Sequence, residues 1–219
     1  STQFYNNVIR KTSGSRALTL GGNSGNQFLY DPQSGIECYN CVAYNNVVVV
    51  DSGPGTYAVT LTGCADCGLF NNVIIGGALH FGTGGNPDGF PQVSPSDPNI
   101  QNNIFYCNGI DPQSGSYTGK LILDYNNYYN CSGTPTQTHP IIGNPQFVDL
   151  QSNWHLNSGS PAIGSGTKVS FTGYSGELID VSKDKDQVTR SEPWSLGIYA
   201  GNTATTNAPP VAPTGLRLQ

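Results

Sequence analysis

The sequence contains no methionine, few charged residues and no long apolar run, and each absence narrows what the chain can be. Charged residues make up only 11% of the chain, whereas amphipathic helices normally carry Lys, Glu and Arg on their solvent face. No run approaches the roughly 18 apolar residues that cross a bilayer, and no secretory leader pattern stands at the N-terminus. We therefore expect an all-β chain without membrane insertion, processed or excised from a longer protein.

The charge balance argues against a further class of partner. The formal net charge is −5 and the pI is near 4.9, so the basic footprint of a nucleic-acid-binding protein is missing. The 28 glycines and 15 prolines supply many turn formers instead. The sequence thus predicts short strands joined by turns, with no nucleic acid as partner.

An Asn-Asn pair recurs along the chain and indicates an internal repeat. Apolar or aromatic residues follow each pair, and an aromatic residue precedes four of the five pairs. The intervals between pairs are unequal, which is typical of a solenoid with insertions in its loops. We align the repeats on the second asparagine of each pair: Asn7, Asn46, Asn72, Asn103 and Asn127.

A second strand pattern lies between the pairs, at residues 17–20, 58–61, 78–81 and 120–123. Strands of neighbouring repeats stack about 4.8 Å apart, so equivalent asparagines can hydrogen-bond to one another along a column. Asparagine also tolerates the left-handed conformation of a tight corner. The sequence predicts a parallel β-helix solenoid over residues 1–200, with at least four stacked repeats and an asparagine ladder at its corners.

The six cysteines allow two interpretations. Cys38-x-x-Cys41 and Cys64-x-x-Cys67 have the spacing of a four-thiolate zinc site. Measured against the repeat, however, all six fall into stacked pairs, which suits columns of buried thiols or disulfides. We favour the columns and keep zinc as the alternative. The expected pairs are Cys38 with Cys64, Cys41 with Cys67, and Cys107 with Cys131.

The C-terminal part carries a resemblance to a known family. The segments 139–149, 154–156 and 159–166, followed by Asp180, Arg190 and Leu196-Gly197-Ile198-Tyr199, resemble the closing module of bacterial secreted right-handed parallel β-helix proteins. That family includes polysaccharide lyases of the alginate and pectate type beside surface proteins of unknown activity. The resemblance implies a secreted or cell-surface location, a polysaccharide or cell-surface glycan as partner, and upstream solenoid repeats in the same parent protein.

Residues 201–219 differ in composition from the repeats. They are rich in Thr, Asn, Ala and Pro, as expected of a linker, and their end resembles the first strand of a fibronectin type III domain. We therefore expect a downstream domain in the parent protein.

Candidate catalytic groups are few. Elimination on a uronic acid needs a cation that neutralises the sugar carboxylate and a base that removes the neighbouring proton. His80, Lys120 and Arg10 are the weak candidates for these roles, and His80 stands out because it lies on a strand beside a long loop. Packing or simple exposure is the alternative for each of them.

A group of acidic residues offers a weak candidate for a metal site. Asp180, Asp184 and Asp186 could bind calcium through their oxygens, although their spacing does not match an EF-hand loop. A solvated acidic turn is the alternative interpretation.

Two functions remain open on this sequence. The chain is either part of a carbohydrate-degrading, lyase-like or glycan-binding protein, or a non-catalytic structural or adhesive surface protein. The sequence has no paired acids at hydrolase spacing and no dense constellation of catalytic groups. We therefore expect little or no polysaccharide-cleaving activity from the isolated chain.

Overall fold

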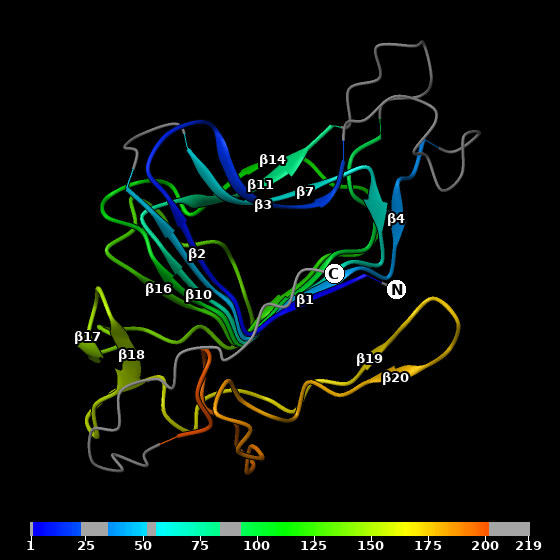
Figure 1. Cartoon of the computed structure of the whole chain (residues 1–219). Helices are drawn as coiled ribbons and strands as arrows, with labels where there is room; N and C mark the ends of the chain where they lie inside the picture. Colours follow the sequence, from blue (N-terminus) through cyan, green and yellow to red (C-terminus); the bar gives the residue numbers. More distant parts are fainter. Residues whose placement is uncertain (1, 23–34, 52–55, 84–92, 202–219) are drawn as a thin grey trace, which may run out of the picture.

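The protein is built from parallel β-sheets whose strands stack on one another (Figure 1). The computed structural model describes residues 2–22, 35–51, 56–83 and 93–201. Within these ranges every regular element is a strand, so no described segment is a helix able to cross a membrane. The all-β class and the stacked parallel strands are confirmed. All but the first residue of the expected linker at 201–219 lies outside the described residues.

Three parallel sheets form the body, and we name them A, B and C. Sheet A consists of β1 (Gln3–Tyr5), β5 (Val42–Tyr44), β9 (Gly68–Phe70), β12 (Asn99–Gln101) and β15 (Ile122–Asp124). Sheet B consists of β2 (Val8–Lys11), β6 (Val47–Val50), β10 (Val73–Ile75), β13 (Ile104–Tyr106) and β16 (Asn127–Tyr129). Sheet C consists of β3 (Arg16–Gly21), β7 (Tyr57–Thr62), β11 (Ala78–Gly82) and β14 (Gln113–Gly115).

The chain passes through sheets A, B and C in that order and then returns to sheet A one strand further along. A short parallel pair, β4 (Cys38–Tyr39) with β8 (Cys64–Ala65), lies between sheets C and A. One apolar core takes side chains from all three sheets, among them Leu61, Leu69 and Ile74. The three sheets therefore share an interior, and each has a second face directed away from it.

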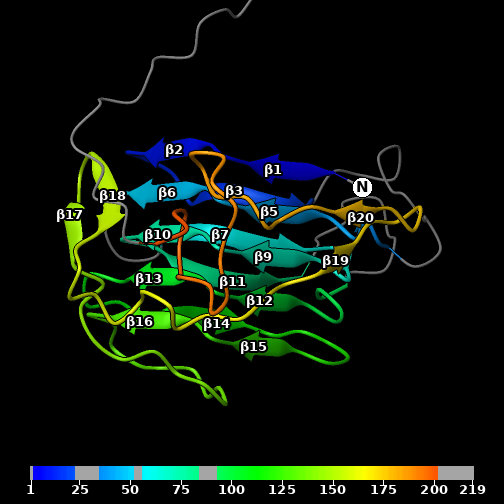
Figure 2. The same cartoon turned by 90° about the horizontal axis from the view of Figure 1, so that it is seen from below.

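The C-terminal segment, residues 140–201, covers the outer faces of sheets A and B. Its strands form two antiparallel hairpins, β17 (Phe147–Asp149) with β18 (Asn153–Leu156), and β19 (Phe171–Thr172) with β20 (Leu178–Ile179). Figure 2 shows this segment running across the stacked strands. Trp154 and Leu196 pack on sheet B, and Phe171 and Trp194 pack on sheet A. Double coverage explains why β6 is four consecutive buried valines rather than an alternating strand.

The second asparagine of the first four pairs and the first asparagine of the fifth form a hydrogen-bonded ladder. The Oδ1 atom of Asn72 accepts from both the backbone N (2.9 Å) and Nδ2 (3.0 Å) of Asn46. Asn72 in turn donates both groups to Oδ1 of Asn103, each at 2.9 Å. The same pattern repeats along the whole column, so every amide is paired in the dry interior. The ladder consists of Asn7, Asn46, Asn72, Asn103, Asn126 and Gln137.

The last repeat corrects our alignment by one residue. Asn126, not Asn127, continues the ladder, because Ile104 pairs with Asn127 in the strand register. Asn127 instead donates to the carbonyls of Ile141 and Gly143 at the start of the C-terminal segment. Gln137 then closes the ladder by accepting from the Asn126 backbone N at 3.0 Å.

The first asparagine of each pair turns the corner between sheets A and B. Asn6, Asn45, Asn71 and Asn102 have φ between 54° and 60°, in the left-handed region that asparagine tolerates. In the last repeat Tyr125 takes this place with φ 54°. The left-handed corner expected from the sequence is therefore confirmed.

Two of these corner asparagines also hold the C-terminal segment. Asn102 exchanges two hydrogen bonds with the backbone of Thr167, at 2.7 and 3.0 Å. Asn45 donates to the carbonyl of Lys183 and accepts from the buried Arg190 guanidinium at 2.9 Å. The guanidinium also donates to three carbonyls of residues 195–199. A single buried cation therefore fastens the end of the described chain to a corner of the stack.

The second strand pattern was correct for three repeats and wrong for the fourth. Residues 17–20, 58–61 and 78–81 lie in sheet C, as one set. Residues 120–123 lead instead into β15 of sheet A, and β14 takes the expected place in sheet C. The sequence-based interpretation missed β14 because Gln113-Ser114-Gly115 has no apolar alternation.

The cysteines lie close to where the repeat places them. Cys38 and Cys64 are direct register partners, and the backbone of Cys41 accepts from Gly68, directly after Cys67. Cys107 and Cys131 form a disulfide with a Cα–Cα distance of 4.8 Å. A second disulfide joins Cys38 to Cys41 within one loop, and Cys64 and Cys67 are free thiols. The pairing as neighbours is confirmed, but the second disulfide does not follow a column.

We expect Asn72→Ala to lower the free energy of unfolding by about 3 kcal/mol or more, because it leaves several buried partners unsatisfied. Those partners are the amide groups of Asn46 and Asn103 and two carbonyls. Asn7→Ala is the matched control, since Asn7 is an exposed end of the same ladder. Chemical denaturation followed by circular dichroism measures both, and equal losses would contradict the ladder's role.

We expect Arg190→Ala to loosen the C-terminal segment, because it strips four acceptors of their buried donor. Limited proteolysis should then cleave within residues 140–201 faster than in the wild type. Lys168→Ala removes a cation of the same segment whose ion pair with Glu192 is exposed, and it should leave the rate unchanged. Equal protection of wild type and Arg190→Ala would refute this role.

Candidate functional site

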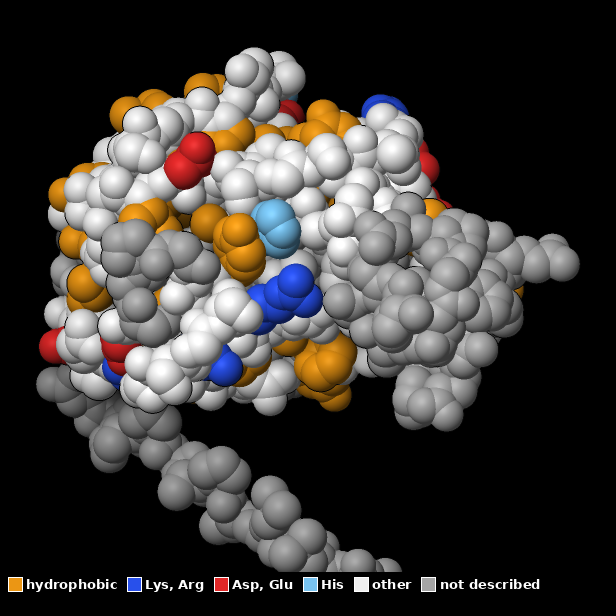
Figure 3. Space-filling view, turned by 90° about the horizontal axis from the view of Figure 1, so that it is seen from above, with side chains coloured by type: hydrophobic (Ala, Val, Ile, Leu, Met, Phe, Trp, Pro, Cys, Tyr) orange, Lys and Arg blue, Asp and Glu red, His pale blue; other side chains and the backbone are white. Residues whose placement is uncertain are grey.

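The outer face of sheet C is the part of the stack that the C-terminal segment leaves uncovered. The described apolar clusters place residues of that segment against sheets A and B and none against sheet C. The strand register lines up four side chains across this face: Thr19, Thr60, His80 and Ser114. Figure 3 views the molecule from this side and shows a histidine beside a hydrophobic side chain and a basic patch.

His80 is held in place by its neighbours on the adjoining strands. Its ring stacks on Tyr57 of β7, with centroids 3.9 Å apart and planes 10° apart. Its Nδ1 atom lies 3.0 Å from Ser114 Oγ of β14. Gly82 follows on the same strand, and a Cβ there would come within 3.3 Å of the imidazole. Stacking and hydrogen bonding therefore fix one ring orientation on the sheet surface.

The electrostatics of this face favour a neutral histidine beside fixed cations. Burial and, second, the nearby Arg16 guanidinium lower the pKa of His80 below its ordinary value of 6.5. Arg16 is exposed at the start of β3, and Lys11 lies over Gly14 in the preceding turn. Near neutral pH the ring can accept a proton while Arg16 and Lys11 attract an anionic group. We name Arg16, Tyr57, His80 and Ser114 the sheet C site, and Thr60 lies fully buried among them.

The other two catalytic candidates lie elsewhere. Arg10 is on β2 of sheet B, where its guanidinium donates to the carbonyl of Gln151 at 2.6 Å and lies 3.9 Å from Asp51. Lys120 is exposed before β15 of sheet A, and its backbone N donates to Asp97. His80, Lys120 and Arg10 thus belong to three different sheets, and the structure does not bring them together. The cation beside His80 is Arg16.

The three aspartates considered for calcium have separate hydrogen-bond partners. Asp184 is buried and accepts from the backbone N of Asp186, Val188 and Ala200, each at 2.8 Å. Asp180 accepts from Ser182 and lines a cavity of about 370 Å³ in the C-terminal segment. Asp186 lies 3.2 Å from His155. Among the described residues, the group of ligand atoms close enough to hold a metal ion is made of cysteines rather than these carboxylates.

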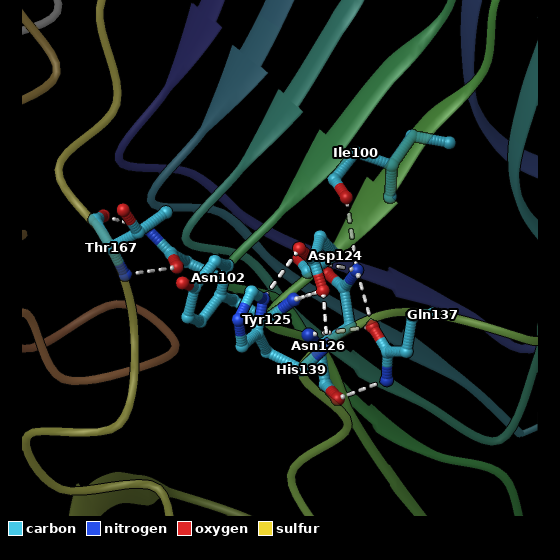
Figure 4. Close-up of polar contacts among 8 residues, drawn as sticks. All are labelled: Ile100, Asn102, Asp124, Tyr125, Asn126, Gln137, His139 and Thr167. Atoms are coloured by element: carbon cyan, nitrogen blue, oxygen red, sulfur yellow. Dashed lines mark hydrogen bonds and ion pairs between the residues drawn. The ribbon is translucent and has the colours of Figure 1, made fainter.

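A second histidine cluster was not anticipated from the sequence. Figure 4 shows Asp124, Tyr125 and His139 near the last ladder residue. The Nδ1 atom of His139 lies 2.8 Å from Asp124 Oδ2, and its ring stacks on Tyr125 at 4.4 Å. Burial acts to raise the pKa of Asp124, but the hydrogen bonds from His139 and Tyr125 outweigh it and lower the pKa. The Asp124 carboxylate also accepts from the backbone N of His139 and so holds the chain there. Asp124 and His139 lie 15 residues apart, and no sequence pattern predicted that they would meet.

We expect Arg16→Gln to raise the pKa of His80 part of the way to its ordinary value, because the substitution removes a nearby positive charge and leaves burial unchanged. An NMR pH titration measures this pKa, with the His80 signal assigned by its loss in His80→Gln. Lys168→Gln, on the C-terminal segment, serves as the control for a change in net charge. An unchanged His80 pKa in Arg16→Gln would show that the guanidinium exerts no effect.

Comparisons with known proteins do not place the chain in a family. No protein-family model matches it, and no curated protein matches it either. A fold by itself does not define a reaction, because one architecture carries many functions. The function of this chain is therefore inferred from its own side chains, and above all from the sheet C site.

Proposed function

We propose that this chain is a right-handed parallel β-helix of a secreted or cell-surface protein, and that it binds an acidic polysaccharide along the outer face of sheet C. The supporting observation is the Tyr57–His80 stack beside the exposed Arg16 guanidinium. An aromatic stack, a cation and hydroxyl groups are the elements that bind a sugar ring and its carboxylate.

The path of the chain supports the solenoid part of the proposal. Sheets A, B and C are visited in a fixed order, and each return advances by one strand. The amide ladder runs through all five repeats at one corner. Parallel strands joined by crossover connections are right-handed in nearly all proteins. The resemblance of residues 139–199 to the closing module of secreted β-helix proteins points the same way.

The shape of the sheet C site suits an extended ligand. Four strands spaced by about 4.8 Å give a surface of roughly 14 Å along the stack. Thr19, His80 and Ser114 follow that direction in register, with the buried Thr60 between Thr19 and His80. Arg16 and Lys11 lie toward one end, where they offset the repulsion that a net charge of −5 exerts on a polyanion. Calcium bridging between carboxylates would act in the same direction.

A catalytic function is the second candidate, and one observation favours it. A neutral His80 beside Arg16 provides a base and a cation close together, as elimination on a uronic acid requires. The ring of Tyr57, however, is stacked on the His80 imidazole, so its hydroxyl does not face His80 across the position of a substrate as a second proton-transfer group would. We therefore propose binding without cleavage, with polysaccharide lyase activity as the outcome that would replace it. A purely structural or adhesive role without glycan binding is the remaining alternative.

The binding experiment uses the full chain against pectate, alginate and a neutral glycan, with and without calcium. We expect affinity for an acidic glycan that falls by about tenfold or more in Tyr57→Ala and in Arg16→Gln, since each removes a stacking or charge-assisted contact. Isothermal titration calorimetry measures the affinity. Matched controls are Tyr174→Ala and Lys168→Gln, exposed residues of the same types on the C-terminal segment.

Two further outcomes decide among the candidates. Cleavage is followed by the ultraviolet absorbance of unsaturated sugars and by new reducing ends, and we expect neither from the wild type. Robust turnover that is lost in His80→Ala would establish the lyase function instead. Absence of binding to every glycan, or equal binding by the sheet C variants and the controls, would leave the structural role and refute the proposal.

A further inference from the structure

Four of the six cysteines converge at the corner between sheets C and A. The sulfur atoms of Cys38, Cys41 and Cys67 all lie within 4.8 Å of one another. Cys64 is the register partner of Cys38 on the adjoining strand, and its thiol hydrogen-bonds to that of Cys67. All four side chains are buried, with at most 8% exposed surface. Two loops of neighbouring repeats thus bring three sulfurs together in one dry space, with the buried Cys64 thiol beside Cys67.

The two loops share a backbone conformation that produces this convergence. Each is a Cys-x-x-Cys segment whose third residue, Asn40 in one loop and Asp66 in the other, has a left-handed φ of 50° or 53°. The loops are also hydrogen-bonded to each other, since the backbone N of Asn40 donates to the carbonyl of Ala65 at 2.9 Å. The left-handed residue reverses the chain so that both cysteines of each loop face the same side.

We propose that, in the reduced chain, Cys38, Cys41, Cys64 and Cys67 bind one Zn²⁺ ion through four thiolates. A tetrahedral zinc site with Zn–S bonds of about 2.3 Å places its sulfurs about 3.8 Å apart. The sulfurs of Cys38, Cys41 and Cys67 already lie within 4.8 Å of one another. Once their disulfide is reduced, the Cys38 and Cys41 sulfurs must separate to reach that spacing, and the Cys64 thiol beside Cys67 must turn toward them. Four soft sulfur ligands without oxygen or nitrogen donors select zinc over calcium or magnesium.

Zinc binding to the reduced chain changes no oxidation state. Four thiols lose four protons as the ion binds, because the thiolate is the form of cysteine that ligates a metal. The structure shows the alternative state of the same corner, in which Cys38 and Cys41 are joined as a disulfide. That disulfide removes two of the four ligands, so it must first be reduced to two thiols, for example by a phosphine, which supplies the two electrons and is itself oxidised to the phosphine oxide while water supplies the two protons. The Cys107–Cys131 disulfide lies in later repeats and takes no part.

The first experiment measures metal on the full chain kept reduced with a phosphine, which is not itself a thiol ligand. After zinc loading and gel filtration, we expect inductively coupled plasma mass spectrometry to find one zinc ion per chain. Co²⁺ in place of zinc should give the intense thiolate charge-transfer and red d–d absorption of a tetrahedral sulfur site. We expect Cys64→Ser/Cys67→Ser to lose the bound ion, and Cys107→Ser/Cys131→Ser to keep it.

A second measurement needs no variant and so does not depend on a variant's folding. Zinc should protect Cys38, Cys41, Cys64 and Cys67 from alkylation in the reduced wild type and leave Cys107 and Cys131 reactive, as read by peptide mass spectrometry. Circular dichroism confirms that the chain stays folded. A folded, fully reduced chain that binds no Co²⁺ or Zn²⁺, or metal retained in Cys64→Ser/Cys67→Ser, would overturn the proposal.

Discussion

A buried column of paired amides is the interaction on which the rest of this structure depends. Each inward asparagine offers its oxygen to two N–H groups of the preceding repeat and its Nδ2 atom to carbonyls of two repeats. An unpaired amide in that interior would cost more than a hydrogen bond contributes, so the repeats must keep their register. The alignment of strands in sheets A and B, which flank the column, follows from this requirement.

The same register decides which outer face the C-terminal segment leaves uncovered. Corner asparagines hold the C-terminal segment against sheets A and B, and its aromatic residues bury the outer valines and isoleucines there. Sheet C carries threonine, histidine and serine on its outer face and has no such cover among the described apolar clusters. The C-terminal segment therefore covers sheets A and B and not sheet C because only the outer faces of A and B are apolar.

Much of the fold could be predicted from the sequence, because the repeat is marked by cysteines and by asparagines, whose backbone conformations and hydrogen bonds are restricted. Asn-Asn pairs marked both the left-handed corner and the ladder, and the cysteine register marked neighbouring loops. The last repeat was misread because Asn127 imitates the ladder position that Asn126 occupies, with Tyr125 at the corner. Of the sheet C site, the sequence predicted only His80 as a candidate. Arg16, Tyr57 and Ser114 lie near it because of the register of three other strands, which the sequence did not give.

The direction of the amide column has a consequence for how such a chain can change in length. Every rung donates the same way, although successive rungs lie 39, 26, 31 and 23 residues apart. Removing or duplicating everything between two ladder asparagines leaves identical donors facing identical acceptors, so the ladder itself tolerates a change of one whole repeat. The contacts of Asn45 and Asn102 nevertheless tie the C-terminal segment to particular repeats. Inserting one residue beside a ladder asparagine turns that side chain outward and leaves its hydrogen-bond partner in the interior unpaired. The amide column therefore restricts changes in its own length to whole repeats, while the unequal spacing of its asparagines shows that the segments between them differ in length.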